Sequence, residues 1–325
     1  MKKYLAMALA LLLALPLLTS CAGGSDGVVI FSSMENYRNE ELTRQLNEAL
    51  PNIDVTVQQI ATGNSAAKIQ AEGDKTEADI VIALETASYQ TIIDNFASLE
   101  SFDQPNYLDE FRYPDSRAVY WDKYEGGILV NTVELKKLGL PEPKSYQDLL
   151  DPQYKGLIVM PNPKTSGTGY MFLNMWVNMM GEDEAFAYVD KLAENVKQFS
   201  ESGSGPVQML NQGEAVIGLG MLFQAVEQIN QGSPIKVIVP EEGCPYNSTL
   251  TGIISGREKD ENVRQVFEYL MNSFFIYDKE YYMPGEIVHD QQLKLENYPT
   301  NVVSGDMSTI TDSELKTRLL DRWKY

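Results

Sequence analysis

Apolar positions follow two different periods along this chain. Short apolar runs of four to six residues, typical of buried strands, occur at 28–31, 78–83 and 156–160. Between the first two runs the apolar residues recur three or four positions apart, as at 38–49, which is typical of amphipathic helices. This alternation of strand and helix predicts an α/β fold whose parallel sheet binds ligands at the carboxyl ends of its strands.

The same reasoning places the remaining elements. Further strands are expected at 53–60, 119–131, 215–220, 235–239 and 250–255, and further helices at 66–72, 89–97, 171–180, 183–195, 207–212 and 263–275. Gly126 and Gly127 leave open whether 119–131 is one bulged strand or a pair of strands. This segment could carry the chain into a second lobe, and the strand at 250–255 would return it.

The turn at 161–170 is the strongest candidate for a ligand contact, because it joins a predicted strand to a predicted helix. Thr165 or Ser166 can cap the helix, and Gly167 and Gly169 leave the first N–H groups uncovered by side chains. Free N–H groups at the positive end of a helix dipole form an anion site. Serine and glycine also form ordinary capped turns, so these ten residues alone leave both interpretations open.

A second turn of the same kind follows at 200–206. Ser204 can cap the next helix, and Pro206 suits its first position. The chain therefore has two serine- and glycine-rich helix starts in one half.

The N-terminus indicates export. Lys2 and Lys3 precede the apolar run 5–18, which is too short for a membrane span of about 20 residues and has the zones of a secretory signal. The sequence Leu18-Thr19-Ser20-Cys21 resembles the lipobox of bacterial lipoproteins. The resemblance implies cleavage before Cys21 and a lipid on that cysteine; plain secretion is the alternative.

The charge and the cysteines restrict the function further. The formal charge is −20, and loss of Lys2 and Lys3 makes it more negative by two, which argues against nucleic acid. Cys244 has no partner once Cys21 is assigned to lipid, so no intrachain disulfide is expected. A catalytic pair of Cys244 with the only histidine, His289, is disfavoured because neither residue lies in a recognisable catalytic neighbourhood.

Several short motifs in order along the chain carry a family resemblance. They are Thr62-Gly63-Asn64-Ser65, Ala71-Glu72-Gly73, Ala78-Asp79-Ile80, the run 150–156, the run 160–170, Ser202-Gly203-Ser204 and Gly213-Glu214-Ala215. Together with the lipobox they resemble the family 1 extracellular solute-binding proteins of bacterial ABC importers, which include ferric-iron and 2-aminoethylphosphonate binders. The resemblance implies a two-lobed periplasmic-binding-protein fold of type II, in which each lobe is a mixed sheet flanked by helices.

The resemblance also implies a domain organisation and partners. The expected parts are a signal peptide at 1–20, a lipidated tether at 21–27, a first lobe at 28–120 plus about 250–285, and a second lobe at 121–249 plus about 286–325. The lobes would close about a hinge as a monomer and deliver solute to an ABC permease and ATPase. The location would be the outer face of the cytoplasmic membrane or the periplasm, with a lipid anchor.

The ligand depends on one comparison within that family. Ferric binders carry a tyrosine pair after the strand that follows the Gly-Glu motif, where this chain has Phe223 and Gln224. Neither side chain supplies an anionic oxygen. Tyr281 and Tyr282 fall outside the expected position. Ferric iron is therefore the weaker alternative.

A phosphonate or a phosphate ester fits the remaining motifs better, because such a solute needs several short donors. The donors expected to bind it are Ser33, Ser65, Ser166, Gly167, Thr168, Gly169, Ser202 and Ser204. If the solute also carries an amine, then Glu35, Glu85 or Glu242 could pair with it, and Tyr124 could stack on it or hydrogen-bond to it. Each serine could instead be a plain helix cap, and each acid plain surface charge.

A secreted phosphoesterase is the alternative from another class. It would need a nucleophile with a base or a metal cluster, and the sequence contains no phosphate-loop lysine motif or zinc spacing. The prediction is a binding protein without catalysis and without a cofactor.

Overall fold

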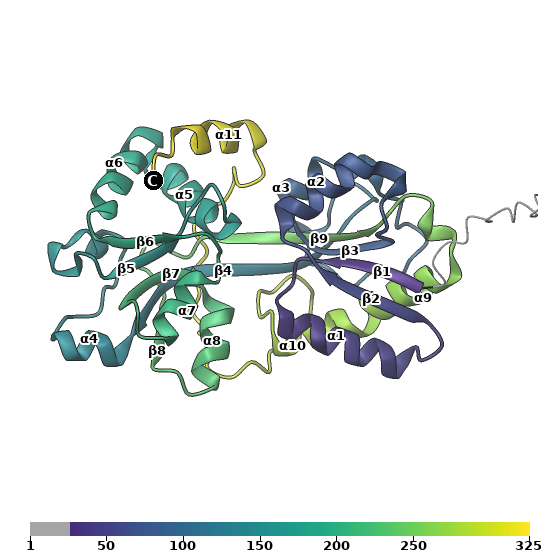
Figure 1. Ribbon diagram of the computed structural model, residues 1–325, viewed down its shortest axis with the longest axis horizontal. Helices are drawn as coiled ribbons and strands as arrows, with labels where there is room; N and C mark the ends of the chain where they lie inside the picture. Colours follow the sequence, from purple (N-terminus) through teal and green to yellow (C-terminus); the bar gives the residue numbers. More distant parts are fainter. Residues whose placement is uncertain (1–26) are drawn as a thin grey trace, which may run out of the picture.

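The structure is a computed structural model that describes residues 27–325. Figure 1 shows two groups of strands and helices joined by the long strands β4 (Val119–Asn131) and β9 (Tyr246–Ile253). We call the group that contains β1 to β3 the first lobe and the group that contains β5 to β8 the second lobe. The predicted signal peptide, the lipid site at Cys21 and the tether up to residue 26 lie outside the described residues.

Parallel strands alternating with helices build each lobe. In the first lobe the elements are β1 (Gly27–Ser32), α1 (Asn36–Ala49), β2 (Asp54–Gln59), α2 (Thr62–Glu72), β3 (Ile80–Glu85), α3 (Thr86–Gln90), α9 (Glu261–Tyr269) and α10 (Phe275–Tyr281). In the second lobe they are α4 (Thr132–Leu138), β5 (Ile158–Pro161), α5 (Gly167–Met180), α6 (Glu182–Ala193), β6 (Val196–Ser200), α7 (Gly205–Asn211), β7 (Ile217–Met221), α8 (Leu222–Asn230), β8 (Ile235–Ile238) and α11 (Ser313–Arg322).

The strands form one mixed sheet that runs through both lobes. Their order is β2-β1-β3-β9-β4-β7-β5-β6, and β8 pairs with β4. β1 pairs in parallel with β2 and β3, and β5 pairs in parallel with β6 and β7. β9 is antiparallel to both β3 and β4. The parallel pairing of the first three strands, predicted from the strand–helix alternation, is confirmed.

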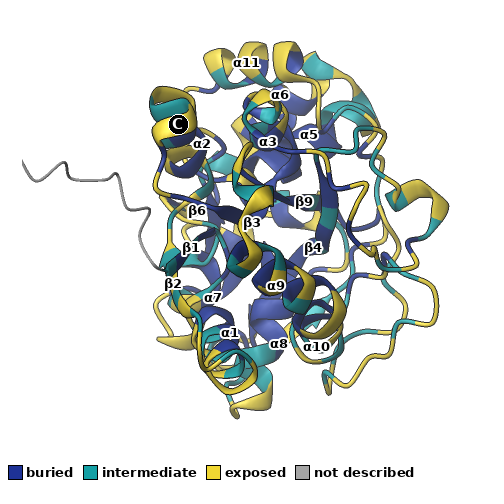
Figure 2. Cartoon of the chain, turned by 90° about the vertical axis from the view of Figure 1, so that its right-hand side faces the viewer, coloured by how far each residue is buried: buried dark blue, intermediate teal, exposed yellow. Residues whose placement is uncertain are grey.

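Each lobe has its own apolar core on both faces of the sheet. In the first lobe the strands pack against α1, α9 and α10 on one face and against α2 and α3 on the other. In the second lobe α5, α6 and α11 cover one face, and α7 and α8 cover the other. Figure 2 shows the strands as buried and the outward faces of the surrounding helices as exposed. The stripe of aromatic and Met side chains on α5 is buried core, as predicted.

Several predicted elements differ from the structure. The segment 119–131 is a single strand, and its register shifts between Tyr120 and Asp122, ahead of the two glycines. Gly126 and Gly127 are instead sites of close packing, because a Cβ at either position would overlap a side chain of α5 or α8. β6, α4 and α8 were not predicted.

Two predicted helices have different ends. The helix predicted at 89–97 is α3 followed by a 3₁₀ turn at Ile93–Asn95, where the Asn95 side chain donates to the Ile92 carbonyl. The helix predicted at 263–275 continues through a π-helical turn at Leu270–Phe274 into α10. The helical segment thus runs beyond the predicted end, and its charged residues Asp278 and Lys279 are both buried.

A third connection between the lobes follows α10. We call residues 282–312 the return segment. A Cβ at Gly285 would overlap the Lys123 carbonyl of β4, so the segment lies directly on that strand. It is held to the first lobe by a bridge between Val288 and Tyr107 and to the second lobe by a bridge between Ser304 and Cys244. The chain then enters α11.

Within residues 27–325 no helix has both the length and the apolar character needed to cross a membrane.

Candidate ligand-binding site

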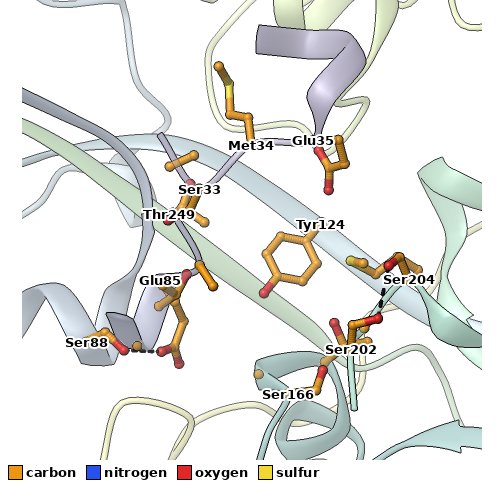
Figure 3. A pocket seen from close by; sticks show the side chains of 18 of the residues that line it. Ser33, Met34, Glu35, Glu85, Ser88, Tyr124, Ser166, Ser202, Ser204 and Thr249 are labelled. Carbon is orange, nitrogen blue, oxygen red and sulfur yellow. Dashed lines mark hydrogen bonds between the residues drawn. The ribbon is translucent and has the colours of Figure 1, made fainter. Parts of the chain in front are cut away.

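A cavity of about 670 Å³ lies between the lobes, beside the carboxyl ends of β1, β2, β3, β5, β6 and β7. Figure 3 shows Ser33, Glu35 and Glu85 of the first lobe and Ser166, Ser202 and Ser204 of the second lobe, with Tyr124 between them. In open α/β sheets this edge is where ligands bind. A concave site of this volume is also the usual size for a small molecule.

The start of α5 forms one part of the second-lobe wall. The helix begins at Gly167, and the Ser166 hydroxyl accepts a hydrogen bond from the Gly169 N–H at 3.4 Å, so the predicted serine cap is confirmed. Gly167 is exposed to the cavity, and a Cβ there would meet no other atom. No side chain therefore covers the start of α5 at Gly167, which is the positive end of the helix dipole.

The loop before α7 forms the adjoining part of that wall. The hydroxyl groups of Ser202 and Ser204 lie 3.2 Å apart, and the Ser200 hydroxyl donates to the Ser202 carbonyl at 3.0 Å. Gly203 packs so tightly on α5 that a Cβ would overlap the Thr168 hydroxyl. The two serine- and glycine-rich turns predicted from the sequence are thus in direct contact.

Gly169 was predicted to contact the solute, but it does not line the cavity. Its α-carbon faces the preceding turn instead, where a Cβ would lie 2.7 Å from the Pro163 nitrogen. Glycine is needed at this position for the helix to pack against its own turn. The N–H group of Gly169 is also already bonded to Ser166.

The first-lobe wall begins after β1 and β2. The Ser33 hydroxyl donates to the Ile60 carbonyl at 3.0 Å, which ties the ends of the two strands together. Ala61, Thr62 and Gly63, at the start of α2, also line the cavity. This helix supplies a further N-terminus from the lobe opposite α5.

Ser65 was predicted to lie at the start of that helix, and this prediction is wrong. α2 begins at Thr62, one turn earlier than predicted, so Ser65 lies within the helix and is buried. Its hydroxyl has no hydrogen-bond partner among residues 27–325, and the residue does not line the cavity.

Arg38 organises a buried group of charges behind the first-lobe wall. Its guanidinium group donates to both carboxylate oxygens of Asp278 at 2.8 and 2.7 Å, to Asp122 at 2.9 Å and to Glu35 at 3.1 Å. Thr249 of β9 donates to the other oxygen of Asp122 at 2.6 Å. This network connects the cavity wall to both strands that cross between the lobes.

The same network contains a second cation. Lys279 donates to Asp278 at 2.8 Å and is also fully buried. Burial alone would raise the pKa of Asp278, but the positive charges of Arg38 and Lys279 outweigh it and hold that pKa below its usual value. Asp278 is therefore a carboxylate, and its charge is already neutralised within the protein.

Glu85 and Lys316 form an ion pair between the lobes. Lys316, on α11, places its ammonium group 3.4 Å from both carboxylate oxygens of Glu85, which ends β3. The same ammonium group lies 4.9 Å from the centre of the Tyr170 ring on α5. Ser88 and Asn247 also donate to Glu85, at 2.7 and 3.3 Å.

A second side-chain contact between the lobes lies at α8. The Gln224 amide donates to Glu35 at 3.1 Å. Phe223, the preceding residue, meets Tyr124 edge to face at 6.4 Å between ring centres. Both residues line the cavity at the position where the resemblance places the tyrosines of ferric binders.

Tyr124 crosses the middle of the cavity from β4 (Figure 3). Burial, reinforced by the negative charge of Glu85, raises its pKa well above the usual value. The phenol is therefore neutral and can act as a hydrogen-bond donor or as an apolar surface.

Glu242 was also predicted as a cavity acid, and the structure places it elsewhere. It lies in the turn after β8, where its carboxylate accepts from the Tyr146 N–H at 3.0 and 3.2 Å. It caps the turn before the 3₁₀ helix Gln147–Leu150 and does not line the cavity.

Most of the predicted site residues do come together. The predicted residues that line the cavity are Ser33, Glu35, Glu85, Tyr124, Ser166, Gly167, Thr168, Ser202 and Ser204. Ser65, Gly169 and Glu242 do not line it. Contact with a solute stays a prediction for the whole set.

Sequence reasoning missed Arg38, Gln224 and Lys316. A signal for Arg38 was available, because it lies four residues before Leu42 and eight before Leu46, on the buried stripe of α1. Lys316 had no such signal, since it lies on the C-terminal helix, far along the chain from every other part of the wall.

The greater part of the chain matches a known protein family. A model of the bacterial extracellular solute-binding protein family matches residues 75–274. The chain belongs to this family. An uncharacterized protein of Haemophilus influenzae is 30% identical to this solute-binding protein over 280 residues, which cover 83% of this chain and 80% of that protein. The predicted family membership is therefore confirmed.

More distant relatives carry names that state a ligand. A putative 2-aminoethylphosphonate-binding periplasmic protein of Salmonella typhi is 26% identical over 142 residues, or 42% of each chain. A thiamine-binding periplasmic protein of Brucella abortus is 28% identical over 166 residues, which cover 50% of this chain and 48% of that protein. Each match spans about half of the relative or less.

Solved structures resemble this solute-binding protein over nearly their whole length. The periplasmic binding protein P5PA matches with a TM-score of 0.75 and 23% identity over 92% of this chain and 98% of that one. The periplasmic binding protein AfuA from Actinobacillus pleuropneumoniae, with fructose-6-phosphate bound, matches with a TM-score of 0.70 and 23% identity over 91% and 97%. Iron-bound HitA from Pseudomonas aeruginosa matches with a TM-score of 0.72 and 13% identity over 92% and 99%. These likenesses confirm the predicted fold class.

Proposed function

We propose that this protein captures a small anionic solute between its two lobes, without chemical change, and delivers it to the permease of an ABC importer. The solute is a phosphonate, such as 2-aminoethylphosphonate, or a phosphate ester. The contacts expected to hold its anionic head are the first N–H groups of α5 and the side chains of Ser166, Thr168, Ser202 and Ser204.

The observation that carries this proposal is the open start of α5. Gly167 leaves the first turn uncovered, and the cavity lies in front of it. A phosphonate or phosphate group needs several donors that converge from one side, and a helix N-terminus supplies them together with a favourable dipole. The loop 202–204 adds two hydroxyl groups beside the same turn.

Two similar proteins have names or titles that support the same class of ligand, whereas another relative is named for thiamine. A relative is named for a phosphonate, and a structural neighbour holds a sugar phosphate. The neighbour that binds iron makes ferric iron the alternative to be tested. Phe223 and Gln224 weigh against that alternative, because neither side chain offers an anionic oxygen.

The membrane anchor is a separate part of the proposal. Lipid on Cys21 would hold the protein at the outer face of the cytoplasmic membrane or in the periplasm, as a monomer beside its permease and ATPase. The lobe boundaries are proposed as 28–120 plus about 250–285 and 121–249 plus about 286–325. Radiolabelled palmitate should enter the wild type and not Cys21→Ser, and label on the variant would contradict the anchor.

Thermal unfolding with a panel of solutes tests the ligand class. A ligand present at about a hundred times its dissociation constant adds roughly 2.7 kcal/mol to the free energy of unfolding. The expected result is a rise of several degrees in Tm with an organophosphonate or a phosphate ester, and recovery of that solute unchanged. No shift with any organophosphonate, phosphate ester or inorganic phosphate, or a visible charge-transfer band with ferric citrate, would contradict the proposal.

A further inference from the structure

Glu35 and Glu85 of the first lobe line the cavity, and each accepts a hydrogen bond from a side chain of the second lobe. Lys316 of α11 donates to Glu85, and Gln224 of α8 donates to Glu35. Neither pair lies within one lobe, so both contacts depend on how closely the lobes approach one another. A carboxylate that takes part in closing the lobes is not free for a solute.

The two carboxylates differ in what remains when the lobes separate. Glu35 keeps its bond to Arg38, which belongs to the same lobe and is held in place by Asp278 and Asp122. Glu85 keeps the neutral donors Ser88 and Asn247, but Lys316 is its one ion-pair partner within residues 27–325. When the lobes separate, Glu85 therefore loses the positive charge of Lys316 and remains a partly buried carboxylate on the wall of the cavity.

The position of Lys316 is itself well defined. Its ammonium group lies over the Tyr170 ring and is shared equally between the two oxygens of Glu85, at 3.4 Å each. The Glu85 side chain is only 7% exposed and that of Lys316 is 24% exposed, so the pair is screened by solvent much less than a surface pair. Any cation that enters the cavity has to compete with Lys316 for this carboxylate.

We propose that Lys316 is a built-in counter-ion that draws the lobes together on Glu85 and thereby reserves the cavity for solutes whose charge is purely anionic. This inference rests on the proposed function for the class of solute and narrows it, because it disfavours the amine-bearing example 2-aminoethylphosphonate within that class. The closing of the lobes by Lys316 does not depend on any solute. A solute with an amine would displace Lys316 and lose the contact that closes the cleft. A solute without an amine would leave the ion pair intact.

The first measurement uses no solute. Small-angle X-ray scattering compares the wild type with Lys316→Met, which keeps an unbranched side chain over Tyr170 but removes the charge. The control is Arg318→Met on the same helix, because the ion pair of Arg318 with Glu182 lies within the second lobe. The radius of gyration should increase for Lys316→Met alone. Equal scattering curves for all three proteins would overturn the closing role.

The second measurement compares two matched phosphonates by calorimetry. Ethylphosphonate and 2-aminoethylphosphonate differ at the amine, so the ratio of their dissociation constants isolates that group. The wild type should prefer ethylphosphonate, and Lys316→Met should shift the ratio toward 2-aminoethylphosphonate by about tenfold or more, while Arg318→Met should leave it unchanged.

The outcomes separate this inference from the proposed function. A wild type that prefers 2-aminoethylphosphonate, or a ratio that Lys316→Met does not change, overturns the claim about the solute and leaves the anion site standing. A wild type that binds neither phosphonate, nor any other solute of the thermal panel, overturns the proposed function and the claim about the solute with it. The scattering result still decides whether Lys316 closes the lobes.

Discussion

The two walls of the cavity use opposite means to present polar groups. The second-lobe wall at α5 and α7 contains Ser166, Gly167 and the loop 202–204, whose donors are neutral. The first-lobe wall contains Glu35 and Glu85, whose charges are already paired. The second lobe also lines the cavity with Lys164, Glu201 and Lys316, but the donors left for an anion are those of its neutral turns, and a charged residue at a cavity need not bind the solute.

The largest expected effect is a loss of stability when the charge network behind the first-lobe wall loses Arg38. Arg38→Met leaves Asp278, Asp122 and Glu35 without their shared partner, so we expect the free energy of unfolding to fall by about 3–5 kcal/mol. Arg44→Met on the same helix is the control, because its pairs with Glu41 and Glu48 are exposed. Urea titration measures both variants, and equal effects would contradict the structural role of Arg38.

The second expected effect concerns the other wall and is a loss of binding without a loss of stability. Gly167→Asp adds a negative charge where a Cβ meets no atom, and an acid in the first turn favours the helix. Two like charges about 4 Å apart repel by about 4 kcal/mol at an effective dielectric constant near 20. We therefore expect the affinity for the anionic solute to fall by at least about a hundredfold.

Gly167→Asn is the matched control for that charge, since it has nearly the same shape and no charge. Calorimetry should show binding by the Asn variant and none by the Asp variant, with similar Tm values for both. Binding by the Asp variant as tight as by the Asn variant would mean that the anion does not lie at α5.

The smallest expected effect tests the packing contact between the two turns of the second-lobe wall. In Gly203→Ala the new methyl group overlaps the Thr168 hydroxyl, and such overpacking usually costs about 1–3 kcal/mol. Adding Thr168→Ala removes that hydroxyl and should restore part of the lost stability. Thermal unfolding of the single and double variants measures this, and strictly additive losses would show that the contact does not matter.

The second-lobe wall was the part of the site that could be predicted from the sequence. Ser166 and Ser204 lie just before predicted helices, where the local rules of capping apply, although only the Ser166 side chain forms the predicted cap hydrogen bond. Ser65 failed by the same rules, because α2 begins at Thr62, where no side chain forms a cap to mark the start. Local patterns thus find a helix start but can misplace it by one turn.

The first-lobe wall could not be predicted in the same way. Glu85 was recognised at the end of a strand, but its partner Lys316 is 231 residues away along the chain. An acid and a lysine so far apart carry no local signal, and both suggest surface charge in a chain this acidic. Glu242 shows the converse error, since an acid in a turn was assigned to the cavity while it caps a different segment.

The fold followed from the strand and helix periods with few errors, and these errors lie where tertiary contacts override the local pattern. Gly126 and Gly127 suggested a bulge, yet they give room to side chains of α5 and α8. The predicted helix ended at 275, yet the chain stays helical to Tyr281, and Arg38 and Lys279 make the burial of Asp278 there possible.

The return segment limits how the two lobes can move. Two adjacent strands, β4 and β9, would by themselves allow both bending and twisting. The return segment lies on β4 at Gly285 and is fastened to each lobe, at Val288 and at Ser304. A third connection restricts twisting of one lobe against the other more than two strands alone would, so a closing movement would bring the same faces of the two lobes together.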